Sequence, residues 1–481
     1  MPTSWAFLKA KRFLMFLFPL VYILSFLFGI RLLLAKNING LLLFIIAGLP
    51  IYIHALSVSF LYGMTKYITF LQSFKELIVL MAFGMVVLSI KKKPSFHLID
   101  KLIFIFFCVS VLYLILPIGT YGFYNRLLAF KALSFFPIIY FTGRFCDFST
   151  IHIKQLFSAI SVVIIIAAVV VLIEVIEYEH LHSHTGFMDF LDYYFNGQQS
   201  GNYGLIWTFE TSSGIKRFGS IFGSPLELSS SAVLGIAAIL ALSTTKKMNF
   251  YPDTFGIISF LATVACIIFA VSRASFVNYL ILLYAYSWLI RNKRMVSYFH
   301  YLVIGIFLYL IFFINKDLLG FIIDTLQFKN ASSIGHLIEW INGINAMFTH
   351  PFGMGLGASG RVSMESDSQI GGENQLVIIG VQVGIGMVAL YFCIYWQLIK
   401  AGIQSLKTAT NKAKPLIVCV VLLKIGLIIP LFTSYIDTFI FITYISYFLC
   451  GLMINMIMAN NHQSSKNTTY SVNAENKNEL T

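Results

Sequence analysis

The sequence predicts an all-α fold, a polytopic membrane helical bundle, and three observations support this prediction. The 481 residues are 58% hydrophobic and only 11% charged, with a mean hydropathy of +0.83, whereas soluble domains carry roughly 25% charged residues. Apolar runs of about 20 residues, the length that spans a bilayer, recur along most of the chain. Lys and Arg gather in the short connections between these runs, as they do in cytoplasmic loops. We therefore expect one bundle over residues 1–459, with about 12–14 transmembrane helices.

The individual spans follow from thirteen apolar runs. These runs cover residues 13–34, 38–63, 74–90, 101–118, 127–142, 155–175, 225–243, 255–272, 275–290, 297–314, 374–399, 415–432 and 434–458. The first run follows Lys9, Lys11 and Arg12 but continues to Leu34 without a small-residue cleavage pattern, so we interpret it as an uncleaved span. Pro50 interrupts the second run. Because proline disrupts a helix interior, we expect two short helices in a shallow hairpin there.

The basic connections predict the orientation of the bundle. Positive residues stay on the cytoplasmic side, which places there the clusters at 91–93, 144–154, 246–247, 291–294 and 400–414. Counting spans between the clusters puts two long polar segments, residues 176–224 and 315–373, on the outer face. The basic N-terminus and the cluster at 91–93 require an even number of crossings, but three runs separate them, so the topology of residues 13–90 stays open. We expect the polar tail, residues 460–481, to be disordered and cytoplasmic.

Composition also limits the ligands that the chain binds. The formal charge of +13 comes mainly from the connections between spans, where cytoplasmic retention explains it, so we expect no nucleic acid partner. The six cysteines are scattered and lack CxxC spacing, which predicts neither a disulfide framework nor a zinc site. We expect no metal and no cofactor. The absence of an obvious internal repeat disfavours a transporter built from inverted repeats.

Two arginines in the predicted outer-face segments are candidate anion ligands. Arg217 precedes a turn rich in glycine, residues 218–225, which leads into a span; backbone N–H groups at such a helix start, with a guanidinium beside them, suit a phosphate. Lys216 adds positive charge. Arg273 lies between two apolar spans, where an arginine in hydrocarbon costs at least about 2.5–3.5 kcal/mol. It either binds an anion or extends to the interface as a snorkelling side chain. Two arginines match a diphosphate better than one.

The segment from Ser332 to Thr349 has apolar residues at helical spacing and ends just before Pro351. It predicts an amphipathic helix that rests on the membrane surface. His336 and Trp340 share one face of it; an imidazole and an aromatic ring together suit a sugar, and an interfacial tryptophan is the alternative. The glycines at 353, 355 and 357 lack the strand and helix of a dinucleotide site.

Glu373 and Asn374 stand at the start of the eleventh predicted span. The helix dipole favours a carboxylate at this position for structural reasons alone. A functional glutamate there would be a general base that takes a proton from a sugar hydroxyl.

Three weaker signals concern buried or loop charges. His180, His182 and His184 alternate in an outer loop, and we interpret them as solvated rather than as metal ligands. Glu174 and Glu177 end a span, and we expect both to face water. Lys424 and Asp437 lie within apolar runs, where they either pair with each other or line a cavity.

These motifs, in this order, resemble the bacterial O-antigen polymerase and ligase family. The resemblance covers about residues 120–390 and consists of Arg217 with its turn, Ser272-Arg273-Ala274-Ser275, Trp340 with His350–Gly357, and Glu373-Asn374. Two positions depart from the family pattern. His336 stands where the family often has an arginine, four residues before Trp340. Glu373 stands where the ligase branch has a histidine, and a glutamate there is more similar to the polymerases.

The resemblance implies a metal-independent glycosyltransferase that acts at the outer face of the cytoplasmic membrane. It would polymerise oligosaccharide repeat units carried on undecaprenyl diphosphate, as an O-antigen or exopolysaccharide polymerase does. The expected partners are this lipid-linked saccharide, the lipid bilayer that holds the protein and, as a candidate, a chain-length regulator. Arg217 and Arg273 would neutralise the departing diphosphate, and Glu373 would complete the catalytic set. The expected substrate-binding residues are His336, Trp340, His350, Asn374 and Lys216.

Two other functions stay open at this point. One is a ligase that transfers finished polymer to a lipid or protein acceptor. The other is a transporter or flippase of lipid-linked sugars. The enzyme is favoured because the charged candidates are expected at one outer surface rather than at the bilayer centre.

Overall fold

The protein is helical throughout the part of the chain that the structure describes. The structure is a computed structural model, and it describes residues 15–91, 94–211, 213–245, 247–312, 331–360, 362 and 370–478. Helix accounts for 74% of the structure. The described ranges contain no strand and only two isolated β-bridges, Glu210 to Lys216 and Thr244 to Phe250. The predicted all-α polytopic bundle is confirmed.

The helices of the N-terminal half lie before and within the first long polar segment, residues 176–224. They are α2 (Leu17–Leu34), α3 (Asn39–Ala47), α4 (Tyr52–Leu61), α5 (Thr65–Leu88), α6 (Leu98–Ile115), α7 (Phe123–Ser134), α8 (Phe136–Phe145), α9 (Ile153–Glu177), α10 (Leu181–His184) and α11 (Phe187–Phe195).

The C-terminal half contains the remaining helices. They are α12 (Pro225–Leu242), α13 (Thr254–Ala270), α14 (Arg273–Leu289), α15 (Lys293–Phe312), α17 (Ala331–Thr349), α19 (Gln375–Val383), α20 (Ile385–Ser405), α21 (Lys414–Gly426), α22 (Ile428–Thr433) and α23 (Ile440–Asn478). Short 3₁₀ turns occur at Phe148–Thr150, Trp207–Phe209 and Ile436–Thr438.

Fewer helices have full spanning length than the sequence predicts. Among the described residues, 8 helices are long and apolar enough to cross a membrane, or up to 10 if each of two bent pairs is one span. The expectation of about 12–14 also included runs such as α13 and α14, which form helices of only 17 residues each, shorter than the usual span of about 20.

Two of the predicted spans are broken helices. Helices α3 and α4 meet at a bend of 64°, and α7 and α8 at a bend of 44°. Pro50 lies in the first break, and Pro137 opens α8, as expected of a residue that cannot donate to a helix interior. The break at Pro50 is therefore confirmed, and the pair α3 and α4 forms either a broken span or a re-entrant loop.

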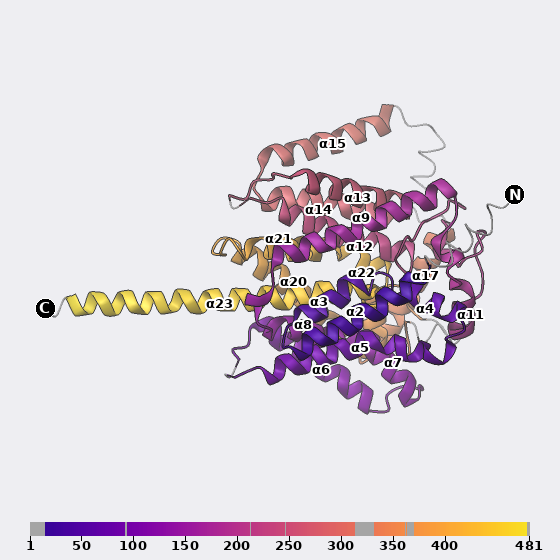
Figure 1. Cartoon of the computed structure of the whole chain (residues 1–481), viewed down its shortest axis with the longest axis horizontal. Helices are drawn as coiled ribbons and strands as arrows, with labels where there is room; N and C mark the ends of the chain where they lie inside the picture. Colours follow the sequence, from indigo (N-terminus) through magenta and orange to yellow (C-terminus); the bar gives the residue numbers. More distant parts are fainter. Residues whose placement is uncertain are drawn as a thin grey trace.

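The two long polar segments lie at the same end of the bundle. Figure 1 shows α11, from the first segment, and α17, from the second, at one end, while α23 leaves the opposite end toward the C-terminus. Helix α23 runs to Asn478 and so includes most of the tail that the sequence analysis expects to be disordered. No proline or glycine interrupts residues 452–478, so each further residue adds one hydrogen bond to an existing helix.

A buried ion pair ties α6 to α8 near the end from which α23 leaves. The Asp100 carboxylate accepts hydrogen bonds from Arg144 Nε at 3.1 and 3.2 Å and from Tyr140 Oη at 2.6 Å. Asp100 is fully buried. Small residues bring α8 and α23 into backbone contact, because a Cβ at Gly143 would lie 2.2 Å from the Phe448 carbonyl oxygen.

We expect Arg144→Met to destabilise the protein by about 3–5 kcal/mol, because it leaves the Asp100 charge buried and unpaired. The free energy of unfolding in detergent measures this. The matched control is Lys131→Met: Lys131 pairs with Glu76 at 3.0 Å but its side chain is 45% exposed, so the loss should be about 0–1 kcal/mol. Equal losses for the two variants would contradict the assigned role of the buried pair.

Candidate functional site

Arg217 is docked against the C-terminal end of α13. Its Nε donates to the carbonyl oxygen of Ala270, the last residue of α13, at 3.0 Å. A backbone hydrogen bond joins the same two segments, because Phe218 N–H donates to Phe269 O at 3.1 Å. The negative end of a helix dipole favours a cation here. Among the described residues this bond uses only Nε, one of the five N–H donors of the guanidinium, and it fixes the position of Arg217.

Arg273 is the first residue of α14, directly after the same turn. Ser272 caps this helix, and the Ser275 hydroxyl donates to Ser229 Oγ of α12 at 2.8 Å. A cation at a helix N-terminus is placed unfavourably, because the dipole is positive there. An anion bound at the α14 N-terminus would reverse that penalty, which is how such ends bind phosphate.

Backbone strain marks the turns that carry the two arginines. Val271, between α13 and α14, has φ +46°, and Ser220, three residues after Arg217, has φ +54°. A β-branched residue is an outlier in the left-handed region. Strained positions of this kind cluster at functional sites.

The charge of Arg217 is coupled to both of the other predicted catalytic residues. Burial lowers its pKa from 12.5 to about 10, the charge of Glu373 raises the pKa again, and the charge of Arg273 lowers it further. Arg217 therefore remains protonated at neutral pH. Such effects require charges that lie near one another, so Glu373 and Arg273 both lie near Arg217, although the three residues come from segments up to 156 residues apart. We call Arg217, Arg273 and Glu373 the charge cluster.

Glu373 is presented by a tight turn at the start of α19. Gly371 and Gly372 precede it with φ of +92° and +58°, a conformation that favours glycine. Asn374 caps α19, because its Oδ1 accepts from the N–H groups of Leu376 and Val377 at 3.0 and 3.2 Å. Asn374, expected to bind substrate, is thus buried and positions the glutamate.

The residue after the cap anchors this turn to the loop between α22 and α23. Gln375 Nε2 donates to Asp437 Oδ2 at 2.7 Å, and Asp437 N–H donates to Gln375 Oε1 at 3.2 Å. Burial raises the pKa of Asp437 to about 7. Lys424 packs over the rings of Tyr447 and Tyr395, 3.9 and 4.7 Å from their centroids. Gln375 is therefore the hydrogen-bond partner of Asp437, which the sequence analysis did not identify, while the positive charge of Lys424 also acts on the Asp437 carboxylate and lowers its pKa.

Helix α17 covers the turn that holds Glu373. A Cβ at Gly343 would lie 2.8 Å from Gly371 Cα, and Glu339 Oε2 lies 2.1 Å from where a Cβ of Gly372 would be. Trp340 is half-buried on this helix, and its Nε1 has no hydrogen-bond partner among the described residues. The predicted amphipathic helix is confirmed, and α17 leaves Ile338 and Phe348 exposed on its other side.

Two further residues, His350 and His336, are predicted to bind substrate. His350 is exposed at the C-terminal end of α17, where its N–H donates to Ala346 O at 2.9 Å. The side chain of His336 lies outside the described residues.

Lys216 belongs to a different environment from Arg217. Its Nζ lies over the rings of Tyr178 and Tyr203, 4.3 and 4.9 Å from their centroids, and donates to the carbonyl of Tyr178. Burial lowers the pKa of Lys216. Consecutive residues of an extended chain point to opposite sides, so Lys216 faces the aromatic residues while Arg217 faces α13. Lys216 stabilises the loop rather than adding to the arginine pair.

His180, His182 and Glu174 are buried, so the expectation that these side chains face water is wrong. His180 and His182 are 1% and 0% exposed. His182 Nε2 lies 2.9 Å from Phe222 O, and its ring is 4.4 Å from that of His54. Glu174 is also buried, and it accepts from Leu181 N–H and Ser220 N–H at 2.8 and 3.0 Å. These groups form the floor under the Arg217 turn, whereas Glu177 is exposed as expected.

We expect the stability of the protein to fall on acidification. Burial lowers the pKa of His180 from 6.5 to about 3, so this contribution is complete above about pH 6.5 and is lost as pH falls toward 3, by up to about 1.4 kcal/mol per unit. His180→Phe should flatten part of this dependence between pH 7.5 and 5, measured as unfolding free energy in detergent. The exposed His350→Phe is the control. An identical pH slope for wild type and His180→Phe would contradict the assignment.

The glycine-containing loop after α17 is packed between two other turns. Gly355 has φ +98°, and a Cβ there would lie 2.1 Å from Ile118 O in the α6–α7 connection. Gly357 N–H donates to Gln382 Oε1 at 3.0 Å, beside the break between α19 and α20 at Gly384. The glycines permit close backbone approach, so this loop supports the site structurally. The predicted single span over 374–399 is broken at that glycine.

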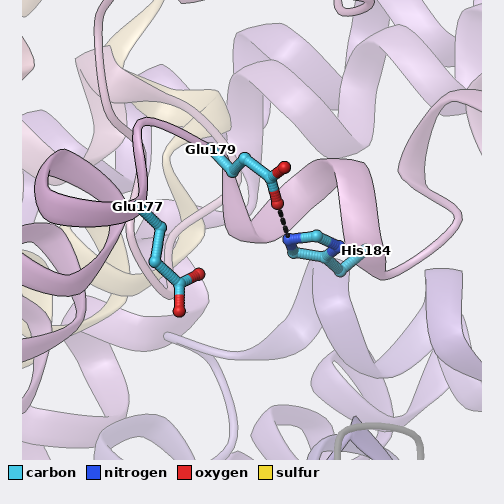
Figure 2. A group of neighbouring side chains, drawn as sticks. All are labelled: Glu177, Glu179 and His184. Carbon is cyan, nitrogen blue, oxygen red and sulfur yellow. Dashed lines mark ion pairs between the residues drawn. The ribbon is translucent and has the colours of Figure 1, made fainter. Parts of the chain in front are cut away.

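One group of side chains at the same end has metal-ligand chemistry. Figure 2 shows Glu177, Glu179 and His184, with His184 Nε2 paired to a Glu179 oxygen at 2.9 Å. Their ligand atoms lie within 4.8 Å of one another. Both glutamates are exposed, and the histidine already has an ion-pair partner, so the group is explained as a surface ion pair.

No family model matches the chain, and no curated protein matches it either. The likeness to the O-antigen polymerase and ligase family thus depends on the short motifs alone.

Proposed function

We propose that this protein is a metal-independent glycosyltransferase that polymerises saccharide repeat units carried on undecaprenyl diphosphate at the outer face of the cytoplasmic membrane. The observation that carries the proposal is the charge cluster of Arg217, Arg273 and Glu373, at the end of a membrane bundle where both long polar segments lie. The basic connections are at the other end, which by the positive-inside tendency is the cytoplasmic one.

The cluster suits the chemistry of this transfer. A hydroxyl of the acceptor sugar attacks the anomeric carbon of the donor, a new C–O bond forms, and the bond from that carbon to the diphosphate oxygen breaks. Glu373 accepts the hydroxyl proton as general base. The bonding electrons leave with the lipid diphosphate, whose growing negative charge is stabilised by the two guanidinium groups. The α14 N-terminus adds a partial positive charge at the same place.

The experiment that tests the proposal uses the purified full-length protein with one lipid-linked repeat unit in detergent. We expect a ladder of longer lipid-linked products and the release of one undecaprenyl diphosphate per glycosidic bond. A ligase would move the saccharide to another acceptor without lengthening it, and a flippase would move the unit without releasing diphosphate. Either of these results would overturn the polymerase proposal.

A further inference from the structure

A cavity of about 440 Å³ lies between α12, α13, α14 and α15, within the usual range for small-molecule sites of about 300–1,000 Å³. It is at the far end of these helices from the arginine cluster. Arg217 precedes α12 and Arg273 begins α14, whereas the cavity is lined by the C-terminal part of α12 and the C-terminal half of α14. The cavity is therefore separate from the proposed active site.

The cavity wall is apolar and open to the side of the bundle. Leu261 of α13 and Tyr298 of α15, both lining residues, are 61% and 68% exposed. Ser287 lines it too, but its hydroxyl donates to Leu283 O of its own helix at 2.8 Å. Water needs two to four polar partners in a buried site, and this wall does not offer them. Figure 1 shows α15 at the edge of the bundle, beside α13 and α14, so the cavity lies at the lateral surface of the bundle.

One end of the cavity is bordered by cations. Arg291 follows the lining residue Ser287 by four positions, and Lys293 and Arg294 directly precede the lining residue Met295. All three are exposed. Asp253 is the acidic residue nearest along the chain to the described segments that line the cavity. Its carboxylate caps α13 by accepting a hydrogen bond from Gly256 N–H at 2.8 Å. The rim is therefore strongly positive where the apolar cavity ends.

We propose that this cavity binds one acyl chain of an anionic phospholipid, whose phosphate is held by Arg291, Lys293 and Arg294. The occupant follows from the combination of surfaces. An apolar slot selects a hydrocarbon chain, and a cluster of cations at its end selects a phosphate with net negative charge, as basic pockets between membrane helices do. In the proposed function undecaprenyl substrates enter at the other end, so this lipid would stabilise the packing of α15 on the bundle and take no part in transfer.

The test is native mass spectrometry of the delipidated full-length protein with added phosphatidylglycerol or phosphatidylcholine. We expect phosphatidylglycerol to bind and phosphatidylcholine to bind at least about tenfold more weakly. Arg291→Gln/Lys293→Gln/Arg294→Gln should lower the bound phosphatidylglycerol by a similar factor. The control is Lys407→Gln/Lys412→Gln, which removes exposed lysines from another connection and should change nothing.

A second pair of variants tests the cavity itself. Leu261→Trp places a large ring on the exposed wall and should displace the lipid, while Ile268→Trp, two turns along α13 and 52% exposed outside the cavity, should retain it. Equal retention by wild type, Leu261→Trp and the triple charge variant would overturn the proposal. Equal binding of the two lipids would overturn it as well, because the rim would then have no role in selection.

Discussion

Arg273→Ala is expected to abolish chain elongation and leave only single repeat units. In the proposed reaction the variant removes one of two cations that face the departing diphosphate, and loss of one group that stabilises developing charge lowers the rate by about 100–1,000-fold. Arg273 begins α14 and is exposed, so its removal leaves the helix and its serine cap intact. The measurement is the length distribution of lipid-linked products formed by the purified variant.

Two controls make this result specific. Arg31→Ala removes an exposed arginine from α2 and should give the wild-type ladder. Arg273→Lys retains the charge but loses the bidentate fork, so we expect activity between those of wild type and alanine variant. A normal ladder from Arg273→Ala would exclude a role for this residue in the reaction.

Glu373→Gln is expected to lower kcat by at least about 100-fold, the usual contribution of a general base. The amide has nearly the same shape, so the turn after Gly371 and Gly372 should persist. KM for the lipid-linked donor should change little, because the carboxylate acts on the acceptor hydroxyl in the transition state.

The comparison for this prediction is Glu179→Gln, an exposed glutamate at the same end of the bundle. It should retain full kcat. If Glu373→Gln retains kcat and raises only KM, Glu373 binds substrate and the base must be another group.

The location of the helices could be predicted from the sequence, because a run of about 20 apolar residues has few alternatives to a span. The breaks within the helices were harder to predict from the sequence. Pro50 predicted one of them, since its effect on a helix is local. The break at Gly384, with φ +90°, depends on Gly353 packing against it, since a Cβ on Gly353 would lie 2.7 Å from Gly384 N. That contact is not local in sequence.

The same distinction between local effects and tertiary contacts decides how much of the candidate site could be predicted. Parity of the spans predicted that Arg217, Arg273 and Glu373 lie at one end, and the coupling of their charges agrees with this. The residues that hold them in place could not be predicted, because they act through tertiary contacts. Gln375 and Asp437 are 62 positions apart.

Burial of the loop side chains was also not predictable from local sequence. The spacing of His180 and His182 is typical of an exposed loop. Their burial comes from the rings of Phe209 and His54, which other segments bring against them.

The most direct test of the central claim is an experimental structure of the full-length protein with an undecaprenyl diphosphate saccharide bound. We expect phosphate oxygens at about 2.7–2.9 Å from guanidinium nitrogens of both Arg217 and Arg273, with the Glu373 carboxylate facing the anomeric carbon of the sugar. Diphosphate bound elsewhere in the bundle, out of reach of both arginines, would contradict the account.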